Sequence, residues 1–279
     1  MRCKTKAEFK EANSFGLGFT NFLFAKNMTG KTYMRPLKIV GKQDYLLANV
    51  SFAPGARCFW HAHRAGVGGG QVIICTAGEG WYQEEGKEAI SLSAGDVVDI
   101  PTDTIHWHGA KADSWFSHVT LEIGGENVRN EFVRPVSDEE YAALEQGNAG
   151  AANGAGMDAG FASYASRQCG FQADSTVESV LVAERGARPS LTLVELSAGT
   201  KTEWIAHDKE SMGELVVCVG GEGCGQTGGR RGKRVAEGVS LLVPAGERFS
   251  ARAGSGMFSL IRIELPILKK TEEHNRRSA

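Results

Sequence analysis

The chain has 279 residues, of which 42% are hydrophobic and 23% are charged, and its formal net charge is -2. This length and composition are typical of a globular protein with two domains of ordinary size. The near-neutral charge argues against a nucleic-acid partner, and no apolar run has the length of a signal peptide or a membrane span. We therefore expect a cytoplasmic protein, without a membrane partner, whose six cysteines stay reduced.

Short apolar segments separated by turn residues dominate the first half of the chain. Bounded by Gly, Pro, Asp or Ser, they predict strands at 46–52, 71–77, 96–100 and 117–123. A helix is predicted over 137–146, where Ser137 and Glu140 form a capping box. The Gly/Ala-rich stretch that follows this helix predicts a linker.

The second half of the chain repeats the first. VSFAPGARCFWHAH aligns with VELSAGTKTEWIAH, and QVIICTAGEG aligns with ELVVCVGGEG. Further along, SAGDVVDIP aligns with AEGVSLLVP, and SWFSHVTLEI aligns with GMFSLIRIEL. Because the order is kept throughout, we predict a duplicated all-β domain, either a barrel or a two-sheet jelly roll. The predicted parts are a first domain with an N-terminal extension, a helix with its linker, a second domain and a charged tail, at 1–135, 136–165, 166–268 and 269–279.

Five of the seven histidines lie between positions 61 and 118. Alternate residues of a strand share a face, so each His-X-His pair points one way, and inward side chains of neighbouring strands converge inside a small barrel. Three imidazoles and one oxygen donor suit Mn, Fe, Co, Ni or Zn. The pattern therefore predicts a site for one divalent transition metal, with these polar residues around it: His61, His63, Gln71, His106, His108 and His118.

The second repeat has lost most of these polar residues. Only His207 and Glu214 remain, at the positions of His63 and Gln71. The other four histidines are replaced by Ile205, Phe249, Ala251 and Leu260. The scaffold thus accepts apolar residues at these places, and burying imidazoles without partners is costly. A functional site is therefore favoured over the alternative, a set of hydrogen-bonded core histidines.

Two segments carry a family resemblance. PGARCFWHAHRAGVGGGQVIICTAGEG resembles the first cupin motif, and GDVVDIPTDTIHWHGA resembles the second. The whole chain resembles a bicupin with one metal-binding and one degenerate domain. HWHG with a glutamine is similar to small bacterial cupins associated with carboxymuconolactone-decarboxylase-like proteins, and to cupin hydroxynitrile lyases. In this sequence the usual carboxylate ligand is a glutamine, and the spacer RAGVGGG before it is longer than usual.

The resemblance implies two double-stranded β-helix barrels and a homodimer. It also implies a division of labour among the polar residues of the first barrel. Its metal ligands would be His61, His63, Gln71 and His106, which leaves His108 and His118 to move protons as the catalytic pair. The second barrel would be structural, covering sheet edges of the first or forming a dimer interface.

Apolar positions in phase with the ligands predict the walls of a substrate pocket. These are Ala48 and Val50 on one strand, and Ile73 and Cys75 on another, although a core thiol is an alternative interpretation of Cys75. Four neutral ligands would leave the full divalent charge on the metal, which favours a small anionic substrate. We expect a metal-dependent lyase, isomerase or decarboxylase acting on a carbonyl or carboxylate compound. The alternatives are a cupin dioxygenase and a non-enzymatic small-molecule-binding bicupin.

Overall fold

The structure is a computed structural model that describes residues 1–41, 45–146, 157–163, 176–183, 188–207 and 211–267. Most of the predicted Gly/Ala-rich linker and the whole charged tail lie outside the described residues. Neither helix in the described part of the chain has the length and apolar character needed to cross a membrane.

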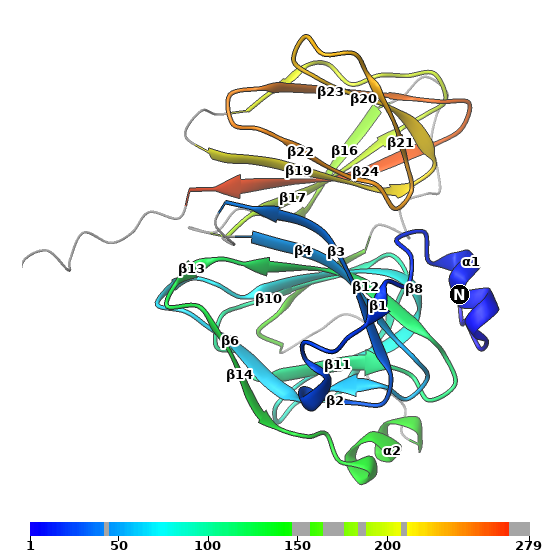
Figure 1. The fold of residues 1–279 in the computed structure, drawn as a ribbon, viewed down its shortest axis with the longest axis vertical. Coiled ribbons are helices and arrows are strands. Elements are labelled where there is room, and N and C mark those ends of the chain that lie inside the picture. Colours follow the sequence, from blue (N-terminus) through cyan, green and yellow to red (C-terminus); the bar gives the residue numbers. More distant parts are fainter. Residues whose placement is uncertain (42–44, 147–156, 164–175, 184–187, 208–210, 268–279) are drawn as a thin grey trace, which may run out of the picture.

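The first half of the chain folds into a barrel of two antiparallel sheets (Figure 1). One sheet joins β1, β3, β4, β12, β8, β10 and β15, and the other joins β2, β5, β11, β6, β14, β9 and the end of β8. A short β7–β13 pair lies beside them. The elements are α1 (Lys6–Ala12), β1 (Phe19–Thr20), the 3-10 helix η1 (Ala25–Asn27), β2 (Met28–Thr29), β3 (Thr32–Val40), β4 (Tyr45–Phe52), β5 (Arg57–Cys58), β6 (Trp60–Arg64), β7 (Val67–Gly68), β8 (Gln71–Glu84), β9 (Ile90–Ser93), β10 (Asp96–Ile100), β11 (His106–Ala110), β12 (Phe116–Ile123), β13 (Gly125–Glu126), β14 (Arg129–Arg134), α2 (Asp138–Gln146) and β15 (Gly160–Ser163).

Strand β8 belongs to both sheets because it bends at Gly78. Before the bend it pairs with β10 and β12, and after it with β9 and β11. Gly78 has φ +73°, and a Cβ there would lie 1.7 Å from the carbonyl oxygen of Trp115. Only glycine accepts both the left-handed backbone and this close approach. Gly221 has the same role in the second half, with φ +70° and a Cβ distance of 1.9 Å to the carbonyl oxygen of Met257.

The second half of the chain forms a second two-sheet barrel, with the orders β16-β17-β24-β19-β22 and β18-β23-β20-β21. Its strands are β16 (Thr176–Val182), β17 (Ser190–Leu196), β18 (Ile205–Ala206), β19 (Ser211–Gly220), β20 (Glu222–Thr227), β21 (Lys233–Ala236), β22 (Ser240–Val243), β23 (Arg248–Ala253) and β24 (Phe258–Pro266).

The strand registers of the two barrels are equivalent. His61 pairs with His106 as Ile205 pairs with Phe249. Gln71 pairs with Glu122 as Glu214 pairs with Glu264. These pairs are the ones that the alignment of the two halves predicts. The predicted fold class, two all-β jelly-roll barrels in one chain, is therefore confirmed.

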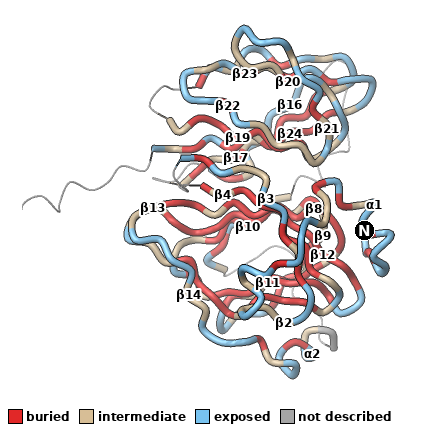
Figure 2. The backbone as a smooth tube through the Cα atoms, viewed as in Figure 1, coloured by how far each residue is buried: buried red, intermediate tan, exposed pale blue. Residues whose placement is uncertain are grey.

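The two barrels pack face to face (Figures 1 and 2). The buried contact joins the outer faces of β4, β8, β10 and β12 to β17, β19 and β24, and across it the Tyr45 hydroxyl donates to the Pro266 carbonyl at 3.0 Å. The second barrel thus covers a face of the first sheet, whereas the sequence analysis expected it to cover sheet edges or to form a dimer interface. The face needs covering because these strands are apolar on both sides: Tyr45, Leu47, Val72, Ile74, Val119 and Leu121 point outward into the shared core.

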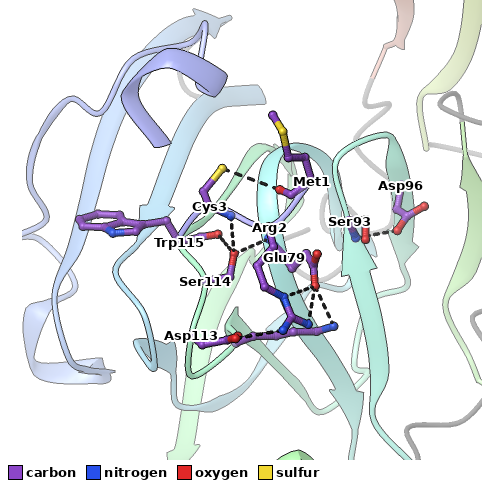
Figure 3. Close-up of polar contacts among 10 residues, drawn as sticks. Met1, Arg2, Cys3, Glu79, Ser93, Asp96, Asp113, Ser114 and Trp115 are labelled. Atoms are coloured by element: carbon purple, nitrogen blue, oxygen red, sulfur yellow. Dashed lines mark hydrogen bonds and ion pairs between the residues drawn. The ribbon is translucent and has the colours of Figure 1, made fainter. Parts of the chain in front are cut away.

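The N-terminal segment, which had no predicted element, is held against the first barrel. Helix α1 starts at a Thr5–Glu8 capping box, and the buried Phe9 ring stacks on Trp115 at 5.0 Å. In Figure 3, Arg2 reaches Glu79 and Asp113, with oxygen–nitrogen distances of 3.1 and 2.9 Å. This segment therefore caps one end of the barrel.

The predicted helix over 137–146 is confirmed as α2, and its capping box is present. The Ser137 amide donates to Glu140 at 2.8 Å, and the Glu140 amide donates to the Ser137 hydroxyl at 3.1 Å.

Candidate metal and catalytic site

The five clustered histidines meet inside the first barrel. His61 and His63 lie on β6, His106 and His108 on β11, and His118 on β12. The rings of His61 and His106 are 4.3 Å apart, and those of His61 and His63 are 5.1 Å apart. Ligand atoms of His61, His63 and His106 all lie within 4.8 Å of one another. This spacing suits three ligands of a single metal ion.

Hydrogen bonds fix how the three rings face. The Nδ1 atoms of His61 and His106 are 2.9 Å from the carbonyl oxygens of Phe59 and Thr104. A carbonyl only accepts, so each Nδ1 carries the proton and each Nε2 keeps its lone pair. The Nε2 atoms of His63 and His106 are buried and have no hydrogen-bond partner among the described residues.

Gln71 lines the same cavity as His61 and His63. Its amide nitrogen donates to the Thr120 hydroxyl at 2.9 Å and to the Glu122 carboxylate at 2.8 Å. Its Oε1 atom is buried and has no partner in the described part of the chain. Unpaired buried polar atoms are costly, and these three acceptors belong to residues on three different strands, β6, β8 and β11. The residues therefore fit a divalent transition metal, for which imidazoles and an amide oxygen are suitable ligands.

His108 and His118 lie next to this group and contact each other. His118 Nε2 is 3.3 Å from His108 Nδ1, and His118 Nδ1 has no partner among the described residues. The Cys58 thiol contacts the backbone of His108, donating to its carbonyl at 3.1 Å and accepting from its amide at 3.2 Å. Ligand atoms of Cys58, His61 and His108 also lie within 4.8 Å of one another, so this thiol is a further residue at the site that the sequence did not single out.

Burial keeps most of these imidazoles neutral. It lowers the pKa of His61 to about 4 and that of His118 to about 3, and it holds the pKa values of His106 and His108 well below the ordinary value. His63 is the exception. Burial lowers its pKa, but the adjacent Glu122 carboxylate outweighs this effect and the net pKa is raised.

A cavity of about 470 Å³ opens beside the histidines. Most of its wall is apolar, and Ala48 and Val50 line it as predicted from their phase. Ile73 and Cys75 do not line it. They are fully buried and pack in the core with Val98 and Ile100 instead, and burial raises the pKa of the Cys75 thiol well above its ordinary value. The apolar lining includes Phe24, Met28, Met34, Phe52 and Phe132.

Glu122 is the main site residue that the sequence interpretation missed. It lines the cavity, contacts Gln71 at 2.8 Å, and lies 3.1 Å from the Nδ1 atom of His63. It is also in phase with His118 on β12, so strict alternation along this strand was a signal for it. Asn130 on β14 was missed as well, and its side-chain oxygen is 2.9 Å from the same His63 nitrogen.

The second barrel holds a different cluster at the equivalent place. His207 Nε2 is 3.2 Å from Glu214, and the Arg262 guanidinium is 2.7 Å from the other oxygen of that carboxylate. Arg262 aligns with Thr120 of the first barrel. The cation that faces Glu214 is thus a side chain of the protein itself.

The chain was compared with known proteins, and no family model matches it. It is 37% identical over 94 residues to an (R)-mandelonitrile lyase of Granulicella tundricola, a match that covers 34% of this chain and 69% of that protein. A vicilin of Solanum melongena superposes with a TM-score of 0.61 at 14% identity, covering 92% of this chain and 86% of that one. A salicylate 1,2-dioxygenase of Pseudoaminobacter salicylatoxidans superposes with a TM-score of 0.58 at 15% identity, covering 79% of this chain and 68% of that one.

The two solved structures share the fold over most of the chain, and the sequence match reaches well above chance in the part that the lyase covers. The two histidine motifs and the 37% identity to the mandelonitrile lyase, of which this chain covers 69%, place the chain in the cupin superfamily, as a relative of the cupin hydroxynitrile lyases, and its two barrels make it a bicupin.

Proposed function

We propose that the first barrel is a metal-dependent lyase that splits a small α-hydroxy compound, such as a cyanohydrin, into a carbonyl compound and a carbon acid. The observation that carries this proposal is the cluster of His61, His63 and His106, whose ligand atoms lie within 4.8 Å of one another. Among the described residues, the Nε2 atoms of His63 and His106 and the oxygen of Gln71, which lines the same cavity, have no hydrogen-bond partner. The sequence similarity to a mandelonitrile lyase supports the lyase class. A bound divalent metal would supply a Lewis acid that stabilises a developing alkoxide or carbonyl oxygen.

The His108–His118 pair supplies the proton transfer in this proposal. Burial keeps both rings neutral, and their mutual contact at 3.3 Å uses one nitrogen of each. Whichever ring donates in this contact, one other nitrogen of the pair keeps a lone pair. That nitrogen accepts the substrate hydroxyl proton as the carbon–carbon bond breaks and its electrons leave with the departing carbon. The imidazolium then returns the proton to that carbanion.

The cavity favours a substrate that is neutral before it reacts. The sequence interpretation placed four neutral ligands around the metal and expected an anionic substrate. In the structure, the Glu122 carboxylate contacts two of these ligands, so a negative charge already lies close to the metal position. With largely apolar walls, we propose a small, partly hydrophobic hydroxy compound whose negative charge develops only in the reaction.

The proposal is tested by loading the apoprotein separately with Mn, Fe, Co, Ni or Zn and measuring the cleavage of mandelonitrile and of related aliphatic cyanohydrins. Release of aldehyde in the presence of at least one metal, and none in the apoprotein, is expected. Oxygen consumption with iron and a gentisate-type substrate, without lyase turnover, would favour a dioxygenase instead. Thermal stabilisation by these compounds without any turnover would favour a binding protein.

A further inference from the structure

We propose that Glu122 is a positioning residue that orients two metal ligands, Gln71 and His63, and carries the negative charge that the glutamine ligand lacks. This inference rests on the proposed metal site of the first barrel. It assigns a role to a residue that lies outside both histidine motifs.

The carboxylate of Glu122 uses one oxygen for each ligand. Its Oε1 accepts from the Gln71 amide nitrogen at 2.8 Å, and its Oε2 lies 3.1 Å from His63 Nδ1. Its side chain is 28% exposed, because it lines the cavity wall. Thr120 and Asn130 assist, since each gives a second acceptor to one of the two ligands.

These contacts decide which atoms face the metal. A glutamine side chain has a donor end and an acceptor end, and only the oxygen is a ligand. Two acceptors hold the amide nitrogen of Gln71, so its oxygen is turned the other way. In the same manner, acceptors on His63 Nδ1 keep the proton there and leave the Nε2 lone pair inward. Glu122 therefore contacts both ligands, whereas Thr120 and Asn130 each contact one of them.

The arrangement also places the negative charge on a residue behind the ligand, and not on the ligand itself. A carboxylate ligand would place a negative charge directly on the metal, as the usual cupin motif does. Here the amide takes the ligand position, and the carboxylate stands behind it. The net charge near the metal is kept, while the directly bound atom stays neutral.

The second barrel has a different set of charged residues at the equivalent strand positions. Glu264, the counterpart of Glu122, pairs in register with Glu214, the counterpart of Gln71. Two carboxylates thus lie on facing positions, and the Arg262 guanidinium contacts Glu214. Facing carboxylates without a cation repel each other. Pairing an amide with a carboxylate avoids that repulsion in the first barrel before a metal binds.

The experiment is a double-mutant cycle between positions 71 and 122, read out as Mn²⁺ affinity of the apoprotein by titration calorimetry. Glu122→Gln should weaken Mn²⁺ binding about 10- to 100-fold, the usual effect of losing an outer partner of a ligand. Gln71→Glu alone should lower the thermal stability of the apoprotein, because it places two carboxylates against each other. Gln71→Glu combined with Glu122→Gln should recover an affinity within a few-fold of the wild type.

Glu131→Gln is the matched control. Glu131 is a carboxylate on β14 that pairs with Arg64 and touches none of the proposed ligands. Its replacement by Gln changes the net charge of the protein by the same amount as Glu122→Gln does. It should leave Mn²⁺ affinity unchanged, and circular dichroism should show that all the variants are folded. An unchanged affinity in Glu122→Gln, or an equal loss in Glu131→Gln, would overturn the inference while leaving the proposed function intact. A wild-type apoprotein that binds no Mn²⁺ or other divalent metal would instead contradict the proposed function.

Discussion

At the scale of single residues, a substitution in the His108–His118 pair tests proton transfer without removing a proposed metal ligand. Replacing His118 by Ala removes one member of the buried pair but none of the proposed ligands. Turnover should fall about 10²- to 10⁴-fold, the usual contribution of a positioned acid or base. Metal content, measured on the same preparation by mass spectrometry, should stay at the wild-type value.

His106→Ala is the companion variant, because His106 offers an unpaired ring nitrogen to the metal position. It should lose both turnover and metal. Loss of metal in His118→Ala as well would show that this histidine holds the ion or the scaffold, and would remove it from the proton-transfer role.

Glu214 gives the second barrel a pH-dependent stability. Burial raises the pKa of this carboxyl to about 7, and Arg262 only partly opposes the shift. The folded state therefore binds the proton more tightly than the unfolded state. The stabilisation of the folded state by protonated Glu214 is fully present below about pH 4.5 and is lost as the pH rises through about 7. A shift of this size corresponds to about 3 kcal/mol at most.

The measurement is thermal unfolding of the wild type and Glu214→Gln between pH 5 and 8. The buried histidines titrate with the opposite sign, since their lowered pKa values favour the folded state at higher pH. The difference between the two proteins isolates Glu214. The wild type should lose stability relative to the variant as the pH rises, and a difference that does not change with pH would contradict the raised pKa.

Alternation along strands predicted the faces of the histidines, but it did not predict what each face meets. Ile73 and Cys75 point into the barrel as their phase requires, yet they lie under packed side chains and away from the cavity. Glu122 has the same phase and lines the wall. Whether an inward residue meets a cavity or a neighbour depends on residues distant in sequence, such as Val98 and Phe132.

At the scale of elements, the bend of β8 at Gly78 carries that strand from one sheet into the other. A Cβ there would meet the Trp115 carbonyl at 1.7 Å, and the backbone is left-handed. Gly78→Ala should therefore lower stability by several kcal/mol, because the backbone around Trp115 has to move. Chemical denaturation gives the free energy of unfolding.

Gly55→Ala is the matched control for this substitution. Gly55 also has a positive φ, +74°, but no atom of the described residues lies within 4 Å of its Cβ position. It should cost only about 1 kcal/mol, from backbone strain alone. Equal losses in the two variants would mean that the close approach to Trp115 does not restrict β8.

Strands β4, β8, β10 and β12 and helix α2 were predicted from the sequence because turn residues and a capping box mark them locally, whereas β3 and β14 were not predicted. The N-terminal helix α1 was not, since its amphipathic pattern spans only Lys6–Ala12 and its single buried residue is Phe9. Its position depends on the stacking of Phe9 on Trp115, a contact between residues far apart in the chain.

At the scale of the whole molecule, the two barrels share one core. Apolar residues of β4, β8 and β12 pack against those of β17, β19 and β24, so neither face is exposed in the intact chain. We expect the two barrels to unfold in one cooperative transition. A protein cut after residue 163, which keeps β15, should expose the outward face of the first sheet, which includes Leu47, Val72 and Leu121, and should aggregate or lose its stable fold.

Calorimetry of the intact protein and solubility of the 1–163 fragment test this expectation. Two well-separated transitions, or a soluble fragment with the wild-type stability, would show that the barrels are independent. The internal repeat predicted that a second barrel exists. It did not predict which face of the first barrel the second one covers, because the two halves of the repeat have the same strand pattern.

The most direct test of the account is the metal content per chain of untagged protein, measured by mass spectrometry beside a His61→Ala/His63→Ala variant and a His207→Ala variant. We expect about one transition-metal ion per chain, lost in the first variant and kept in the second, because Arg262 already provides the cation beside Glu214. A value near zero after loading with all five metals would contradict the metal site and with it the proposed lyase.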